Sequence, residues 1–375
     1  MSKKKIIIVG PAHPYRGGIA AFNERLARQF QSEGQEVEIC NFTLQYPSFL
    51  FPGKTQYSEN PAPDDLIINR KINSVNPLNW ISIAKKIKKQ KPDIVLFRYW
   101  LPFMAPCFST MARIIKRNKH TRIVTLADNM LPHEKRFGDR MLTRYMVSGS
   151  DAFVVMSREV LADLRKFTKT KPAIVTPHPI YDSYGEIISK EEARKKLRLS
   201  KDGNIILFFG FIRRYKGLAL LLKAMCYEQV RRHHVKLLIA GEYYGNEKAY
   251  KNLMKHYNVE QDLILATHFI PDEEVKNYFC AADVVVQPYL SATQSGISQM
   301  AYHFEKPMIV TNVGGLPEIV PDGKVGYVTV VKSQSVADAI ARFYDEDKEA
   351  EFTENVRREK LRFSWSNVTK AILTI

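Results

Sequence analysis

Apolar runs alternate with amphipathic stretches along the chain, and the spacing predicts strands separated by helices. A helix is expected over residues 18–32, and residues 45–75 stand apart as a proline-rich, weakly periodic excursion. The apolar runs of the first half are KIIIVG, VEICNF, DIVLFRYW, RIVTLAD and AFVVMS. Strands that are apolar throughout and alternate with helices are typical of a parallel sheet covered on both faces.

A second series of apolar runs follows a proline-rich link. Its members are IILFFG, VKLLIAG, LILATHF, DVVVQPY, MIVTNVG and VGYVTV. The link contains Pro172, Pro177 and Pro179, which places a boundary within residues 172–190. The two series predict an α/β protein with two Rossmann-like parallel-sheet domains, residues 1–180 and 181–359. The helical tail is long enough for residues 360–375 to pack back on the first domain.

Composition agrees with a globular protein of two domains. The chain has 375 residues, of which 45% are hydrophobic and 25% charged. No apolar run approaches the roughly 20 residues that cross a bilayer. The basic start leads into an apolar run that is too short for a signal peptide, so we interpret it as a first strand. Four scattered cysteines without paired spacing indicate reduced thiols and a cytoplasmic protein.

Positive charge is concentrated in the first half of the chain. Residues 1–171 carry 29 Lys and Arg against 14 Asp and Glu, a net of +15 out of +17. The densest groups are Lys85, Lys86, Lys88, Lys89 and Lys91, and then Arg113, Lys116, Arg117 and Lys119. Basic residues interleaved with apolar ones suit an anionic membrane surface, and a solvated helix face explains them equally well.

A nucleic acid is the other anionic partner to consider. The sequence contains no zinc-ligand spacing, no RNP-like strand and no recognition-helix pattern. We therefore expect no nucleic-acid partner, and a nucleic-acid-binding protein remains only a weak alternative.

Open α/β sheets bind ligands at the carboxyl ends of their strands, so the loops that follow strands are the candidate sites. The first such loop runs from Gly10 to the adjacent pair Gly17 and Gly18, before a helix. Glycines allow close backbone approach, and a helix start offers free N–H groups to an anion. The loop lacks the GxGxxG pattern, so a dinucleotide cofactor is not favoured.

The second loop is cationic. Arg213, Arg214 and Lys216 lie between a strand that ends at Gly210 and a helix expected near Gly217. A diphosphate leaving group needs cations that balance its charge as the bond to it breaks. Loop cations are often merely solvated, but a strand-to-helix turn favours a binding role.

The third loop is rich in small polar residues. Thr293, Gln294, Ser295 and Gly296 precede a helix expected near Ile297, a pattern that indicates a phosphate cradle. The next strand closes on a double glycine followed by Glu318, which is either a ligand contact or a helix-start carboxylate.

The chain resembles the retaining glycosyltransferases of family 4, which have the GT-B architecture of two Rossmann-like domains facing a central cleft. The segments that carry the resemblance are RGGIAAFNERLA, LADNMLPHEKR, FGFIRRYKG, LLIAGE, FIPDEEVKNYFCAADVVVQPY and SGISQMAYHFEKPMIVTNVGGLPE. The resemblance implies a UDP- or GDP-sugar donor held by the second domain, a glycan or lipid-linked acceptor on the first, and no cofactor or metal. The basic first half fits an anionic lipid or a lipid-diphosphate acceptor, so we expect a role in cell-surface polysaccharide synthesis at the cytoplasmic face of the membrane.

The resemblance also assigns residues. It places Gly17 and Gly18 against the donor diphosphate, and it makes Arg213 and Lys216 the pair that neutralises this group. The remaining donor contacts that it implies are the helix-start amides of Ser295, Gly296 and Ile297, the nucleobase segment Phe269 and Ile270, and the carboxylate of Glu318.

Three positions depart from the family pattern. Phe211 stands where a basic residue is usual after the strand-end glycine. The two glutamates of the E-x7-E motif are replaced at Thr293 and about Ala301, so the ribose contact is unassigned. Thr293, Gln294 or Glu305 could supply part of it. The first-domain segment reads Ala127-Asp128-Asn129 instead of carrying a His before Asn, with His133 further on; Asp128 is either a contact to the donor sugar or a turn cap.

In a retaining transfer the departing phosphate can accept the proton of the acceptor, so no protein base is required. Orientation and electrostatic stabilisation of the diphosphate then supply most of the rate. The alternatives on the same architecture are a sugar-nucleotide epimerase, which needs acid and base carboxylates in the cleft, and a phosphorylase, which usually needs a lysine that carries pyridoxal phosphate. The sequence shows neither requirement.

Overall fold

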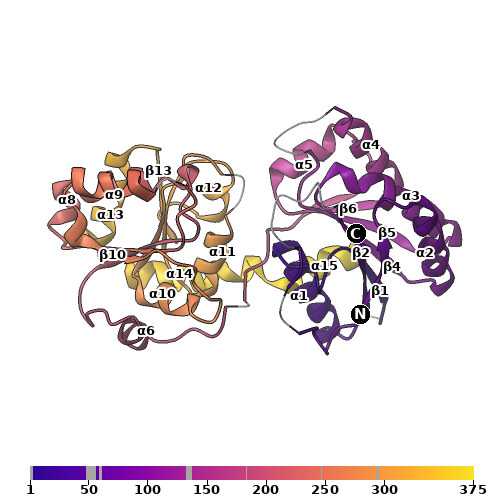
Figure 1. Cartoon of the computed structure of the whole chain (residues 1–375), viewed down its shortest axis with the longest axis horizontal. Coiled ribbons are helices and arrows are strands. Elements are labelled where there is room, and N and C mark those ends of the chain that lie inside the picture. The colour runs from indigo at the N-terminus through magenta and orange to yellow at the C-terminus, as the bar shows by residue number, and fades with distance from the viewer. Residues whose placement is uncertain are drawn as a thin grey trace. The chain divides into compact units, whose positions relative to one another are not determined.

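A computed structural model describes residues 3–47, 56–58, 61–131, 137–182, 184–245, 247–292 and 295–375. The chain forms two compact units (Figure 1). The first unit contains Met1–His178 together with Trp365–Ile375, and the second contains Pro179–Ser364. Each unit is built on one parallel sheet, which confirms the prediction of two Rossmann-like domains.

The sheet of the first unit has the strand order β3-β2-β1-β4-β5-β6-β7, and every neighbouring pair is parallel. Its strands are β1 (Lys5–Val9), β2 (Glu36–Leu44), β3 (Ile68–Asn73), β4 (Ile94–Tyr99), β5 (Arg122–Ala127), β6 (Ala152–Val155) and β7 (Ala173–Val175). The apolar runs predicted five of these strands. The edge strand β3 lies inside the excursion expected over residues 45–75, so that interpretation was wrong at this point.

Side chains of the first sheet alternate between two cores. Ile6 and Ile8 pack on the face covered by α1 (Gly18–Ser32) and α15 (Trp365–Thr374). Ile7 and Val9 pack on the opposite face. That face is covered by α2 (Pro77–Gln90), α3 (Ala105–Ile115) and α4 (Asp139–Gly149). The shorter helices are η2 (Pro102–Met104), η3 (Lys116–Asn118) and α5 (Arg158–Arg165).

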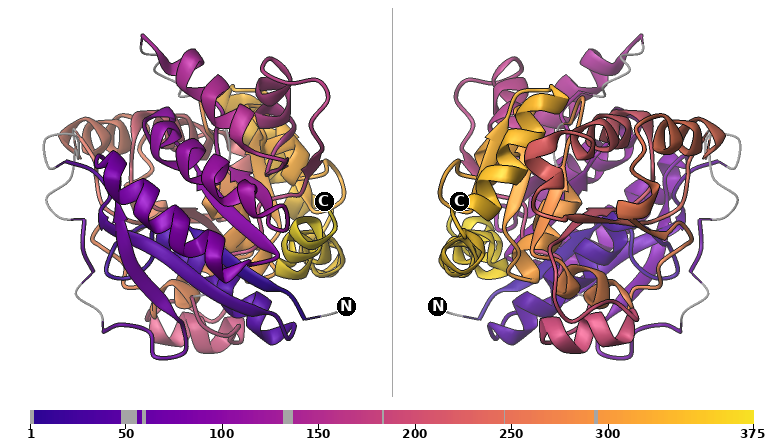
Figure 2. Two further views of the ribbon diagram at one scale, coloured as in Figure 1. Left: turned by 90° about the vertical axis from the view of Figure 1, so that its right-hand side faces the viewer. Right: turned by 90° about the vertical axis from the view of Figure 1, so that its left-hand side faces the viewer.

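The last helix completes the first unit. The indole ring of Trp365 in α15 lies 4.8 Å from the ring of Phe22 in α1, measured between centroids. Figures 1 and 2 show α15 in yellow at the C-terminus of the chain, and Figure 2 shows the strands and the covering helices of the units from two further sides. Among the described residues, no helix is both long enough and apolar enough to cross a membrane.

The sheet of the second unit has the order β10-β9-β8-β11-β12-β13, again parallel throughout. Its strands are β8 (Ile205–Phe209), β9 (Lys236–Ala240), β10 (Leu263–Ala266), β11 (Val284–Gln287), β12 (Met308–Thr311) and β13 (Gly326–Thr329). One face is covered by α7 (Leu218–Met225), α8 (Glu228–Arg231), α9 (Glu247–His256) and α13 (Ser333–Asp345). The other is covered by α6 (Lys190–Lys196), α10 (Val275–Ala281), α11 (Gly296–His303) and α12 (Leu316–Ile319).

In the part of the chain that the structure describes, the second unit also contains three short 3₁₀ helices and the helix α14. They are η4 (Arg214–Lys216), η5 (Glu260–Asp262), α14 (Glu349–Lys360) and η6 (Leu361–Phe363). Helix α14 reaches both cores, because Phe352 packs in one of them and Val356 in the other.

Both sheets reverse their strand order once, between β1 and β4 in the first unit and between β8 and β11 in the second. Parallel α/β sheets bind ligands outside the carboxyl ends of the strands at such a point. The glycine loop follows β1, the cationic turn follows β8, and the loop of small polar residues follows β11. The fold therefore puts each predicted loop at a reversal point of its own sheet.

Candidate functional site

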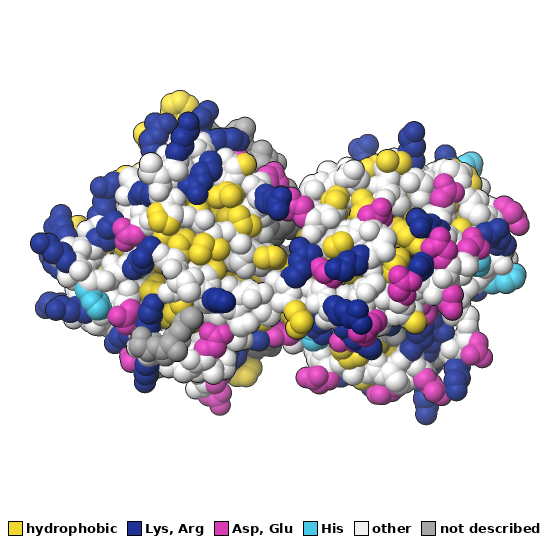
Figure 3. Space-filling view, turned by 180° about the vertical axis from the view of Figure 1, so that it is seen from behind, with side chains coloured by type: hydrophobic (Ala, Val, Ile, Leu, Met, Phe, Trp, Pro, Cys, Tyr) yellow, Lys and Arg dark blue, Asp and Glu magenta, His cyan; other side chains and the backbone are white. Residues whose placement is uncertain are grey.

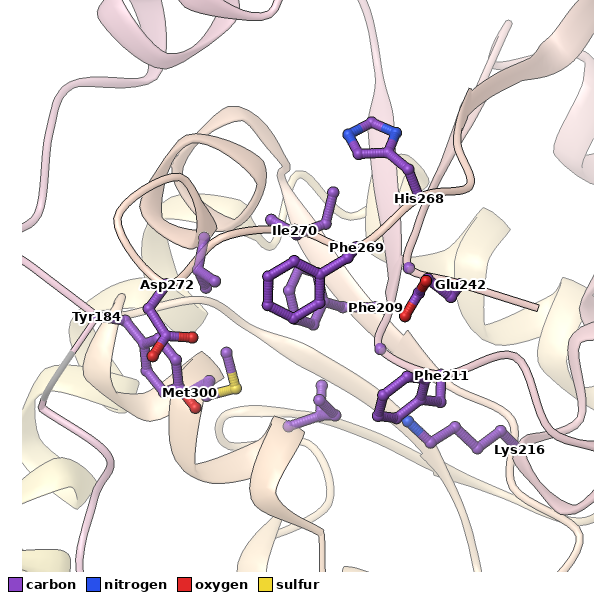
Figure 4. Close-up of a pocket in the computed structure, with 14 residues that line it drawn as sticks. Tyr184, Phe209, Phe211, Lys216, Glu242, His268, Phe269, Ile270, Asp272 and Met300 are labelled. Atoms are coloured by element: carbon purple, nitrogen blue, oxygen red, sulfur yellow. The ribbon is translucent and has the colours of Figure 1, made fainter. Parts of the chain in front are cut away.

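The second unit contains a pocket of about 260 Å³ at the carboxyl ends of β8 and β9 (Figure 4). Four residues predicted from the sequence line it, namely Lys216, Phe269, Ile270 and Ile297. The other lining residues are Tyr184, Phe209, Gly210, Phe211, Gly241, Glu242, His268, Asp272, Val275 and Met300. The walls are thus mainly apolar and aromatic, with a few polar groups, as in sites for small organic ligands.

Lys216 brings a buried positive charge to this pocket. Its side chain is only 8% exposed, and burial together with the charge of Arg213 lowers the pKa of its ammonium to about 8. A Cβ added at Gly210 would lie 2.7 Å from Lys216 Nζ, and Gly210 also has a positive φ of 93°, so glycine is required there. Among the described residues, the ammonium has no hydrogen-bond or ion-pair partner.

The cationic turn packs directly against the segment that leads to α11. The backbone N–H of Leu290 donates to the carbonyl of Tyr215 at 2.7 Å. Gly217 has a φ of 72°, and a Cβ on it would lie 1.9 Å from the carbonyl oxygen of Pro288. The side chain of Ile297 in turn lies 3.4 Å from the Cβ position of Gly210. The structure therefore brings Lys216 and the start of α11 together around one glycine.

The start of α11 is organised by Ser295. Its hydroxyl accepts a hydrogen bond from the N–H of Ser298 and donates to Gln287 Oε1 at 2.6 Å. The side chain of Ser295 is therefore a helix cap for the N–H of Ser298, and the N–H groups of Gly296 and Ile297 have no intrahelical acceptor. These groups and the helix dipole favour an anion. Thr293 and Gln294 lie outside the described residues.

Aromatic side chains also line the pocket. Phe269 follows β10 and lines the pocket although its side chain is 62% exposed. Phe211 also lines the pocket, at the position where the resemblance leads one to expect a basic residue. The Arg213 guanidinium is not a lining group, because it stacks on the ring of Tyr244 at 4.0 Å from the centroid. Its influence on the pocket is through its charge, which lowers the pKa of Lys216.

The sequence reasoning missed several polar residues of the pocket. Glu242 comes two residues after β9, and Asp272 follows the segment Phe269–Ile270 before α10. Tyr184 comes from the link between the units. Glu242 and Asp272 could have been predicted, because each closely follows a predicted strand and ligands bind at the carboxyl ends of parallel strands. Tyr184 carries no such signal.

Glu318 lies in the first turn of the short helix α12, where its side chain is exposed and does not line the pocket. The end of β12, which precedes it, is tied to β11 through a hydrogen bond from Thr311 Oγ1 to the carbonyl of Tyr289 at 2.6 Å. A contact between Glu318 and a donor stays a prediction.

In the first unit, the glycine loop presents an open stretch of backbone. Gly17 precedes α1 and Gly18 is its first residue. Apart from their chain neighbours and the backbone of the helix itself, no heavy atom of the described residues lies within 4 Å of the Cβ position of either. Asn41 Nδ2 fixes the earlier part of the loop by donating to the carbonyls of Ala12 and His13 at 2.7 and 2.9 Å. A ligand could approach the backbone of the two glycines closely.

Asp128 directly follows β5 and is held in an ion pair with Arg98 of β4. Arg98 Nε donates to Asp128 Oδ2 at 2.8 Å, and its NH2 group contacts Oδ1. Arg98 is only 2% exposed and stacks on Phe22 at 3.8 Å from the ring centroid. Burial raises the pKa of Asp128, against the opposing effect of Arg98. Sequence reasoning weighed a sugar contact and a turn cap for Asp128 and overlooked Arg98, a charged residue inside an apolar strand.

Side chains that could bind a metal ion do not form a cluster among the described residues. Within the described ranges, no group of three or more His, Cys, Asp or Glu side chains is arranged to hold a metal ion. Metal independence of any reaction stays a prediction.

Two family models match the chain. Glycosyltransferase Family 4 matches residues 16–183, and Glycosyl transferases group 1 matches residues 189–359. The pocket and the turn around Lys216 fall within the second match.

Curated relatives are about one quarter identical to the chain over the segments that align. D-inositol 3-phosphate glycosyltransferase of Corynebacterium urealyticum is 26% identical over 255 residues, which cover 65% of this chain and 60% of the relative. The chain therefore spans about three fifths of the length of that relative. Lipopolysaccharide 1,2-N-acetylglucosaminetransferase of Salmonella typhimurium is 26% identical over 193 residues, or 48% of this chain and 50% of the relative.

Solved structures resemble the chain over nearly its whole length. HepE from Anabaena, solved with UDP, has a TM-score of 0.72 at 14% identity, covering 98% of each chain. Sucrose-phosphate synthase from Thermosynechococcus elongatus has a TM-score of 0.68 at 16% identity, covering 99% of this chain and 97% of that one. At such low identity the likeness shows the fold alone.

Proposed function

Since this chain belongs to glycosyltransferase family 4 and has the GT-B fold, we propose that it moves a sugar, with retention of configuration, from a nucleotide-diphosphate donor to a glycan or lipid-linked acceptor. The observation that carries the proposal is the buried ammonium of Lys216, which lies beside the start of α11 and has no anionic partner among the residues that the structure describes. The second unit would bind the donor, and the first unit the acceptor.

The physical reason is charge balance. A cation removed from water and left unpaired is costly, and the lowered pKa of Lys216 expresses that cost. A donor diphosphate in the pocket would supply the missing counter-charge, and the first-turn N–H groups of α11 would hold its oxygens. As the sugar–oxygen bond breaks, negative charge on the leaving diphosphate increases, so the same groups stabilise the transition state more than the ground state.

The transfer itself can proceed without a protein base. The bond between the anomeric carbon and the diphosphate oxygen breaks, and the acceptor oxygen attacks from the same face. The proton of the acceptor passes to an oxygen of the departing diphosphate. Because Lys216 and α11 supply positive charge, we propose transfer without a divalent metal or a cofactor.

The basic surface of the first unit supports an anionic membrane as the place of action. Lys85, Lys86, Lys89 and Lys91 in and after α2 are exposed, as are Arg117 and Lys119 beside η3. Figure 3 shows Lys and Arg side chains gathered on this unit. Such clusters are attracted to anionic lipid by about 1 kcal/mol for each residue near the surface. A membrane-bound acceptor for cell-surface polysaccharide would meet the enzyme there.

Sedimentation with vesicles tests the membrane contact. Vesicles that contain phosphatidylglycerol should pull down the wild-type chain at low salt, and pure phosphatidylcholine vesicles should not. The triple variant K85E/K86E/K89E should lose most of this binding, whereas E191Q/E192Q in the second unit should keep it. Equal binding of the wild type to both kinds of vesicle would contradict the electrostatic contact.

Sugar transfer is tested by incubating the purified chain with UDP- and GDP-sugars, with and without a membrane extract as acceptor source. The expected result is acceptor-dependent release of the nucleoside diphosphate that persists in EDTA and is lost in Lys216→Met. The matched control Lys223→Met changes an exposed lysine of the same unit and should retain activity. Isomerised donor formed without acceptor would establish the epimerase alternative, and absence of any turnover or nucleotide binding would refute the proposal.

A further inference from the structure

The pocket of the second unit is polarised along its length. Lys216 lies at one end and Asp272 at the other, and the ring of Phe269 lies between them (Figure 4). Phe209, Ile270 and other hydrophobic residues form most of the wall between these two charges, and Glu242 and His268 also line the pocket. A well-matched ligand therefore has an anionic end, a flat ring system in the middle and hydrogen-bond donors at the far end.

The carboxylate of Asp272 is available to such donors. Among the described residues it has no hydrogen-bond or ion-pair partner. Asp272 is an exposed residue on the rim of the pocket, where partial burial of its carboxylate and the neighbouring charge of Glu273 raise its pKa. Its titratable neighbour in the pocket is Tyr184, whose pKa is raised to about 12 by burial and by the charge of Asp272. Because this carboxylate lines the pocket and only accepts hydrogen bonds, a ligand that brings N–H groups to the rim can pair with it.

The nucleobases differ in what they offer to a carboxylate, which only accepts hydrogen bonds. Guanine presents two donors side by side, N1–H and the 2-amino group, and they match the two oxygens of one carboxylate. Uracil presents a single N3–H between two carbonyl oxygens, which the carboxylate would repel. Adenine and cytosine each place a ring nitrogen acceptor next to their amino group. Only guanine makes a two-point contact without a clash of acceptors.

We infer that the donor is a guanosine-diphosphate sugar and that Asp272 selects its base by accepting hydrogen bonds from N1–H and the 2-amino group. The ring of guanine would stack on Phe269, and its diphosphate would reach Lys216. The inference rests on the proposed function, since it assumes that the pocket holds the donor nucleotide.

Isothermal titration calorimetry with GDP, IDP, UDP and ADP tests the base selection. IDP is the sharpest probe, because its base is guanine without the 2-amino group. Hydrogen bonds to a charged group contribute enough to make GDP bind about 10-fold more tightly than IDP, and about 100-fold more tightly than UDP. In Asp272→Asn the ratio of GDP to IDP affinity should fall to near one.

The control variant is Glu273→Gln, which removes a negative charge next to Asp272 but leaves the pocket carboxylate in place. Each substitution removes one negative charge and therefore increases the general attraction for diphosphates. The ratio of the affinities for two nucleotides cancels this effect and reports on the contact to the base. Glu273→Gln should keep the preference for GDP. Tight binding of UDP equal to or stronger than that of GDP, or an unchanged GDP preference in Asp272→Asn, would overturn the inference while leaving the proposed function intact. If none of the four nucleotides binds, the proposed function fails as well.

Discussion

Replacement of Lys216 by methionine should stabilise the unliganded protein and at the same time abolish sugar transfer. The ammonium is buried, and its pKa is lowered from 10.5 to about 8. Between these two pH values the unfolded chain binds more protons than the folded chain, so the stability contributed by this group rises with pH through that window. Below pH 8 the full penalty is present. Methionine has a similar length and no charge, and it therefore removes the penalty.

The size of the effect follows from the pKa shift. A difference of 2.5 between 10.5 and about 8 corresponds to about 3 kcal/mol at 1.36 kcal/mol per unit. Relaxation around the new side chain reduces this figure, so a gain of about 1–3 kcal/mol is expected. For a unit of this size, each kcal/mol raises Tm by about 2–4 °C. The loss of the charge that stabilises the leaving group should lower kcat by about 100-fold or more.

Differential scanning calorimetry of the unliganded wild type and Lys216→Met at pH 7 and pH 10 measures the stability effect. The Tm of the variant should exceed that of the wild type at pH 7, and the gap should narrow at pH 10 because the wild-type lysine loses its proton. The exposed Lys223→Met should show neither effect. A variant that melts below the wild type at pH 7, or a gap that widens with pH, would refute the reasoning about burial. Full transfer activity in the variant would refute the catalytic role.

Three further predictions concern other parts of the two units. Gly217→Ala should destabilise the second unit by about 1–3 kcal/mol in urea unfolding and weaken nucleotide binding, because its Cβ would collide with the carbonyl of Pro288; unchanged stability would contradict the close packing. Asp128→Ala should cost about 3–5 kcal/mol in chemical denaturation of the first unit, since it leaves Arg98 buried and unpaired, and a loss below 1 kcal/mol would argue against a tight ion pair. The kcat/KM for the donor should fall as pH rises through about 8, where free Lys216 loses its proton; a profile that stays flat to pH 9 would exclude Lys216 as the titrating group.

The apolar runs were sufficient for the central strands of both sheets but not for the edges of the first. A central parallel strand is covered on both faces and therefore apolar throughout, as in β1 and β4. Strand β3 reads INRKIN, and among its side chains only Ile72 is fully buried. Strand β7 has three residues and lies at the other edge. Neither edge strand carries the pattern on which the prediction depended.

The residues of the candidate site that could be predicted are those that come soon after a single predicted strand. Lys216 ends the short helical turn η4 after β8, Ile297 is the second residue of α11 after β11, and both line the pocket. Arg213 shares the loop of Lys216, but its backbone is extended while Lys216 ends a helical turn, so the two side chains diverge. The spacing of Arg213 and Lys216 along the chain does not predict that their side chains point in different directions. Asp272 and Tyr184 meet only because the tertiary fold brings separate segments to one pocket.

The ion pair between Arg98 and Asp128 in the first unit could have been predicted from the sequence. Arg98 is a charged residue in the apolar run DIVLFRYW, and a buried cation requires a carboxylate partner. In the parallel register, Tyr99 lies opposite Ala127, so the first residue after β5 is level with the end of β4. That residue is Asp128, and its N–H donates to the carbonyl of Tyr99 at 2.9 Å. The buried charge of Arg98 therefore requires the carboxylate of Asp128 for folding, whether or not Asp128 takes part in a reaction. A loss of transfer in an Asp128 variant is evidence of a catalytic role only if the first unit is shown to remain folded.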